Sequence, residues 1–103
     1  MHVIEAMLFL LPHEAGGRSG TIWPREGNYR PYLRADEESA LLRVRIIEGP
    51  PRIEPGSGAL VMFEVESDAL DSLIVGAELA LLERAESIGI VTVMRLWRSA
   101  IAV

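Results

Sequence analysis

Short stretches of alternating apolar and polar residues recur along this chain. The clearest covers residues 42–46, where three aliphatic residues alternate with two arginines. Residues 59–66 end in the same way, with Phe63 and Val65 set beside glutamates. Because successive side chains of a strand point to opposite faces of a sheet, each stretch predicts a strand with one apolar face.

Three other segments predict extended structure. Residues 3–11 form an apolar run, and residues 88–97 are rich in β-branched side chains, which favour strands. Pro31 disfavours helix in the residue before it, so residues 29–34 predict a short extended piece. Residues 48–58 are dense in glycine and proline and predict a loop between strands.

Two segments carry a helical pattern instead. Between residues 69 and 87, apolar residues recur at the spacing of one helix face, so the pattern alone favours a helix there. Residues 36–41 begin with three acidic residues, a composition typical of a first helical turn. The pattern leaves the structure of both segments open.

The size and composition of the chain are those of one soluble globular domain. Its 103 residues are 50% hydrophobic and 24% charged, which is enough to form one core. No apolar stretch approaches the roughly 20 residues that cross a bilayer, and the N-terminus lacks the basic region of a secretory signal. We therefore expect a cytoplasmic protein without a membrane span. The lack of cysteine excludes disulfides, thiolate metal sites and cysteine nucleophiles.

The titratable residues argue against catalysis. Of the two histidines, His2 lies at the chain end, and His13 has Glu14 beside it but no second histidine at metal-ligand spacing. The sequence contains no nucleophile elbow, phosphate-binding loop or dinucleotide fingerprint. The acidic residues 36–38 are expected to be a solvated loop. We therefore predict no enzyme, no cofactor and no metal site.

A cluster of arginines with aromatic neighbours is the one candidate binding site. Its members are Arg18, Arg25, Tyr29, Arg30 and Arg34. Such a set can grip phosphates, stack on exposed bases or form the centre of a protein interface. The structural alternative is that Tyr29 and Arg30 only hold their loop against the fold. The net charge of −5 repels phosphate backbones at long range and argues against non-specific nucleic-acid binding.

Five short motifs occur in an order that resembles one known family. Residues 16–18 read Gly-Gly-Arg, and residues 27–31 read Gly-Asn-Tyr-Arg-Pro. Residues 53–57 read Ile-Glu-Pro-Gly-Ser, residues 76–81 read Gly-Ala-Glu-Leu-Ala-Leu, and residues 88–91 read Ile-Gly-Ile-Val. The third, C-terminal domain of elongation factor Tu has Gly-Gly-Arg, Gly-Tyr-Arg-Pro, Met-Pro-Gly-Asp, Gly-Leu-Arg-Phe-Ala-Ile and Val-Gly-Ala-Gly in the same order.

This resemblance implies an all-β fold, a six-stranded antiparallel closed barrel formed by residues 1–103 as a single domain. It also implies that residues 69–87 are a loop leading into a strand, against the helical pattern. The resemblance covers only the C-terminal domain of the family and none of its GTPase domain, so this domain alone is not expected to bind GTP. In the family the Gly-Gly-Arg and Tyr-Arg-Pro region lies near the surface that meets aminoacyl-tRNA, which implies an RNA contact for Arg18 and Arg30.

The chain departs from the family before its last strand. Residues 82–86 read Leu-Glu-Arg-Ala-Glu, where the family has Arg-Glu-Gly-Gly-Arg. Arg84 and Ala85 replace the two glycines, and Glu86 reverses the charge of an arginine. Since each phosphate contact contributes to nucleic-acid affinity, this reversal predicts weakened tRNA binding.

The sequence therefore supports several functional hypotheses. The first is a non-catalytic binding module that contacts a protein partner, one that also meets elongation factor Tu. The second is a tRNA- or RNA-binding module related to translation, working through Arg18, Arg25, Tyr29 and Arg30. A third is an immunity or decoy protein against a toxin directed at translation. A fourth is a homodimer formed through Trp97 and the apolar residues 100–103.

Overall fold

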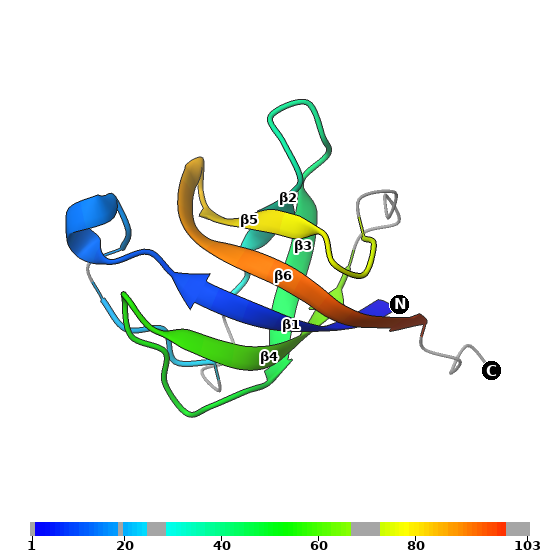
Figure 1. The fold of residues 1–103 in the computed structure, drawn as a ribbon, viewed down its shortest axis with the longest axis horizontal. Coiled ribbons are helices and arrows are strands. Elements are labelled where there is room, and N and C mark those ends of the chain that lie inside the picture. The colour runs from blue at the N-terminus through cyan, green and yellow to red at the C-terminus, as the bar shows by residue number, and fades with distance from the viewer. Residues whose placement is uncertain (1, 19, 25–28, 67–72, 99–103) are drawn as a thin grey trace.

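The computed structural model describes residues 2–18, 20–24, 29–66 and 73–98. Within them lie six strands and one short 3-10 helix, η1 (His13–Ala15). The strands are β1 (His2–Leu10), β2 (Tyr32–Arg34), β3 (Leu42–Glu48), β4 (Gly58–Val65), β5 (Glu78–Glu83) and β6 (Glu86–Arg98). They close into an antiparallel barrel in the order β1-β4-β3-β2-β5-β6 (Figure 1). The predicted fold class is confirmed.

The period-two pattern of the strands sorts their side chains between the barrel interior and the solvent. On β3, Leu42, Val44 and Ile46 are buried, and Phe63 of β4 is fully enclosed at 0% exposure. Among the described residues, no polar or charged side chain is buried in this core. Arg45, on the outer face of β3, instead pairs with Glu64 directly opposite on β4, with Nη2 3.0 Å from Oε1.

The helical pattern over residues 69–87 was misleading, and the strand implied by the resemblance is present. Residues 69–72 lie outside the described part of the chain, and β5 occupies Glu78–Glu83 between β2 and β6. Leu79 and Leu81 point into the barrel with period two. A strand at this position closes the barrel and pairs the backbones of both neighbours, and this tertiary requirement outweighs local spacing.

Residues 36–41 form turns and no helix. The Asp36 carboxylate accepts hydrogen bonds from the Glu38 N–H, at 2.9 Å, and from the Ser39 hydroxyl, at 3.0 Å. These bonds, the Glu38 one foremost, lower the pKa of Asp36 below its ordinary value. A side chain that binds its own backbone in this way competes with helix formation.

The part of the chain that the structure describes contains no helix that could span a bilayer.

Candidate functional site: a mixed-charge cleft beside the β5–β6 hairpin

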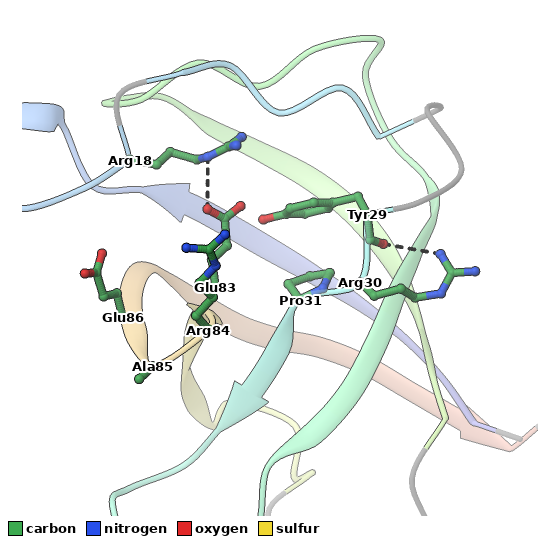
Figure 2. Close-up of a pocket in the computed structure, with 8 residues that line it drawn as sticks. All are labelled: Arg18, Tyr29, Arg30, Pro31, Glu83, Arg84, Ala85 and Glu86. Atoms are coloured by element: carbon green, nitrogen blue, oxygen red, sulfur yellow. Dashed lines mark hydrogen bonds and ion pairs between the residues drawn. The ribbon is translucent and has the colours of Figure 1, made fainter.

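A cleft of about 540 Å³ lies where the β5–β6 hairpin meets the loop after η1 and the segment that leads into β2 (Figure 2). Its volume is within the range of small-molecule and side-chain binding pockets, about 300–1,000 Å³. The lining residues are Arg18, Tyr29, Arg30, Pro31, Glu83, Arg84, Ala85 and Glu86. Three segments that are distant in sequence therefore build one surface.

Two glycines direct Arg18 into the cleft. Gly16 ends η1 in the left-handed region, at φ 89°, and its N–H donates to the His13 carbonyl at 3.1 Å. Gly17 then packs directly against the Leu11 carbonyl, at a place where any Cβ would overlap the carbonyl oxygen. The Arg18 Nη1 donates to the Thr21 carbonyl at 3.0 Å, which fixes the side chain after the turn.

Arg18, Tyr29 and Glu83 form the centre of the cleft. The Arg18 Nε lies 3.2 Å from the Glu83 Oε1, and both side chains are about one-quarter exposed, at 27% and 25%. The guanidinium carbon also lies 5.8 Å from the centre of the Tyr29 ring, within cation–π range. Contacts among these three residues thus join the loop after η1, the segment before β2 and the β5–β6 hairpin.

The environment of Tyr29 favours its neutral form. Burial raises the pKa of the Tyr29 phenol far above its ordinary value of 10.0, and the neighbouring Glu83 carboxylate raises it further, while the Arg18 charge acts in the opposite direction. The phenol oxygen makes no hydrogen bond of full geometry with the described residues. Figure 2 shows the oxygen directed toward the Glu83 carboxylate, the neighbouring charge that raises its pKa.

Arg30 lies at the edge of the cleft and turns outward. Its Nη1 donates to the Tyr29 carbonyl at 3.4 Å (Figure 2). Its Nε lies 3.8 Å from the Oε1 of Glu66, the residue after β4. Both contacts hold Arg30 against its own loop and the neighbouring strand end. Its role at the cleft is therefore that of a rim residue.

Three of the five predicted site residues come together in this cleft, namely Arg18, Tyr29 and Arg30. Arg34 lies on β2, directly opposite Ala80 of β5, and is not among the lining residues. Arg25 lies outside the described residues.

The residues that the prediction missed come from the hairpin, and above all Glu83, the ion-pair partner of Arg18. The family motif also has a glutamate at this position, so the comparison of residues 82–86 contained the signal. In the sequence, Arg84 and Glu86 differ from the family motif, and in the structure they line the same cleft. The departures therefore lie inside the candidate site.

The hairpin has a two-residue loop with an unusual backbone. Glu83 and Glu86 are paired, which leaves Arg84 and Ala85 as the loop. Arg84 has φ 57°, and it is the only non-glycine residue with positive φ in the described part of the chain. Positive φ at the first loop residue alone is the pattern of a type II′ turn, where glycine is the preferred residue.

We expect Arg84→Gly to stabilise the protein. Relief of left-handed strain, about 1–3 kcal/mol, outweighs the extra freedom of glycine in the unfolded chain, about 0.5–1 kcal/mol. A net gain of about 1 kcal/mol corresponds to roughly 4–8 °C in Tm for a domain of this size. Thermal unfolding followed by circular dichroism measures it. Ala85→Gly is the matched control, since Ala85 has no positive φ to relieve, and a lower Tm for Arg84→Gly would contradict the expectation.

The cleft offers paired charges and an aromatic ring. Its lining holds three arginines and two glutamates, and Arg18 is already neutralised by Glu83. The described residues contain no group of three or more acidic or histidine side chains placed to hold a metal ion. Such a surface is suited to complementary side chains of both charges.

Comparisons with protein-family models and with curated proteins found no match to this chain. The resemblance to the elongation factor Tu domain therefore rests on the residue motifs themselves.

Proposed function

We propose that this protein is a non-catalytic binding module, a barrel of the elongation factor Tu C-terminal type, that contacts a protein partner through the cleft between Arg18 and the β5–β6 hairpin. One observation carries the proposal. The arginine with the most central position, Arg18, is held in an ion pair with Glu83 and against the Tyr29 ring, so the cleft presents a rigid surface of mixed charge.

The backbone supports the family resemblance at three motif positions. Gly17 of the Gly-Gly-Arg motif approaches the Leu11 carbonyl too closely for any other residue. A Cβ on Gly89 would lie 2.7 Å from the Phe9 carbonyl oxygen. Arg84 has left-handed backbone where the family has glycine. Gly17 and Gly89 leave no room for a Cβ, and the positive φ of residue 84 is a conformation that glycine adopts with the least strain.

A protein partner is favoured over RNA by the charges of the cleft. A phosphate that approached Arg18 would meet the carboxylate of Glu83, and Glu86 lines the same surface. The net charge of −5 adds long-range repulsion. A protein surface with exposed lysine or arginine beside acidic or hydroxyl groups can instead pair with both signs.

Site-directed crosslinking tests the proposal. A photo-reactive amino acid in place of Ala85 should yield a discrete protein adduct in cells, whereas the same group in place of Glu37, in the loop before β3, should not. The captured protein is then purified and titrated against the wild type and Glu83→Gln. We expect weaker binding to Glu83→Gln, because this change removes the ion pair that holds Arg18 and takes one carboxylate out of the cleft.

Two results would contradict this function. One is crosslinking at position 85 to RNA alone, joined by gel shifts that show salt-sensitive tRNA binding, which would favour the RNA-binding alternative. The other is a captured protein that binds Glu83→Gln as tightly as the wild type. In that case the partner contacts another part of the barrel.

A further inference from the structure

The outer surface of the barrel has an apolar patch that the cleft does not use. It consists of Met7 and Phe9 on β1, Leu60 on β4 and Ile90 on β6, which are 43%, 40%, 50% and 42% exposed. We call these four residues the β4–β1–β6 face. Their sequence neighbours point into the core, so the alternation of the strands fixes the four outward.

Strand register makes these side chains one continuous surface. Met7 is directly opposite Leu60 across the β1–β4 pair, and Phe9 is directly opposite Ile90 across the β1–β6 pair. Figure 1 shows β1 running between β4 and β6. Side chains directly opposite on one face of antiparallel strands are in contact distance. Contiguous exposed apolar surface of this kind marks interaction sites.

A small acidic pocket adjoins the patch. It has a volume of about 190 Å³, and its lining residues are Glu5, Glu48, Gly49, Leu60, Val61 and Met62. This is below the range of small-molecule sites, about 300–1,000 Å³, and suits one side chain of a partner. Glu48 and Glu5 flank Met62 on the two neighbouring strands, so the pocket has an apolar floor between two carboxylates.

The rest of the rim is also acidic. Thr92 of β6 lies directly opposite Met7 on one side and directly opposite Glu78 of β5 on the other. Glu78 is therefore one strand away from the apolar patch.

Among the described residues, two basic side chains lie near this rim, and both are paired with glutamates: Arg45 of β3 with Glu64, and Arg95 of β6 with Glu5 at 3.4 Å, where Arg95 remains 75% exposed. An exposed ion pair of this kind contributes little energy and exchanges partners easily.

We propose that the β4–β1–β6 face and its pocket dock a partner protein that carries a lysine or arginine beside exposed apolar side chains. The apolar side chains cover Met7, Phe9 and Leu60, and the cation enters the pocket between Glu5 and Glu48. Lysine and arginine suit this pocket, because their aliphatic stems cover apolar surface while the charged end meets a carboxylate.

Charge complementarity selects this occupant over a second copy of the chain. Two copies meeting through this face would bring together the same acidic rims, and each copy carries a net charge of −5. The face shares no residue with the cleft of the proposed function. The two proposals can therefore fail separately.

Peptide selection tests the docking surface directly. A random peptide library on phage is panned against the purified protein, and peptides that also bind Met7→Asp are removed. The remaining peptides should be enriched in lysine or arginine next to aromatic or aliphatic residues. A synthetic peptide from this set should bind about tenfold more weakly to the double variant Glu5→Gln/Glu48→Gln, as expected for loss of a charged hydrogen bond. Binding should also weaken as salt is raised.

Matched variants separate surface chemistry from folding. Leu60→Ser should weaken the peptide as Met7→Asp does, while Glu37→Gln/Glu38→Gln, which removes the same charge from a distant loop, should leave binding unchanged. Circular dichroism establishes that each variant is folded. The proposal is overturned if no peptide remains after depletion, or if the remaining peptides lack cationic residues. It is also overturned if the wild type elutes as a dimer that Met7→Asp dissociates.

Discussion

Replacement of Gly17 by alanine should destabilise the protein by about 3 kcal/mol, the upper end of the cost of overpacking a filled site. An alanine Cβ would overlap the Leu11 carbonyl oxygen and stand 2.9 Å from the Pro12 carbonyl oxygen. Both obstacles are backbone atoms, which cannot rotate away as a side chain can. For a domain of this size the loss corresponds to a fall of roughly 12–24 °C in Tm.

The same substitution should also open the cleft. The loop can accept a Cβ only by moving away from Leu11, and Arg18 is the next residue along that loop. Arg18 would then leave the Glu83 carboxylate and the Tyr29 ring. We expect a partner captured at the cleft to bind Gly17→Ala more weakly even below its Tm.

Gly20→Ala is the control, because it adds the same methyl group to the same loop, and nothing lies within 4 Å of the added Cβ. Its Tm should stay close to that of the wild type. Equal melting temperatures for Gly17→Ala and Gly20→Ala would show that the loop is free to rearrange, and that Gly17 does not position Arg18.

The strands could be predicted from the sequence where one face of each strand is buried. On β3 the aliphatic residues and arginines alternate because the barrel interior accepts only apolar side chains, so the sequence pattern and the structure have one cause. On β5 this link fails. Leu79, Leu81 and Leu82 are all buried, and the register shifts between the last two, so the strand lacks a clean alternation. Only the family resemblance identified it.

The site was less accessible to sequence reasoning, because it depends on which strands become neighbours. Grouping arginines by closeness in sequence placed Arg34 beside Arg30, but β2 begins between them, and the register of that strand fixes Arg34 opposite Ala80. The partner of Arg18 is Glu83, which comes from a hairpin far along the chain. No local pattern connects those two residues. Barrel closure does, since β5 lies next to both β2 and β6.

Alkaline pH should destabilise the protein through Tyr29. The folded-state pKa of this phenol lies above its unfolded value of 10.0, so the stability that comes from its neutral form is complete below pH 10 and is lost as pH rises above it. The loss is up to about 1.4 kcal/mol for each pH unit. The physical cause is the buried position of the phenol beside Glu83, where a phenolate would face both desolvation and a second negative charge.

The composition makes this measurement clean, because the chain has no lysine and no cysteine, and arginine stays protonated throughout the range. The free energy of unfolding is measured by urea denaturation between about pH 9 and pH 12, for the wild type and Tyr29→Phe. The difference between the two proteins cancels the groups that titrate in both. With rising pH, the free energy of unfolding of the wild type should fall relative to that of Tyr29→Phe, by up to about 3 kcal/mol over that range. Parallel curves would show that the Tyr29 phenol is solvated, and they would remove the buried contact with Glu83 on which the rigidity of the cleft depends.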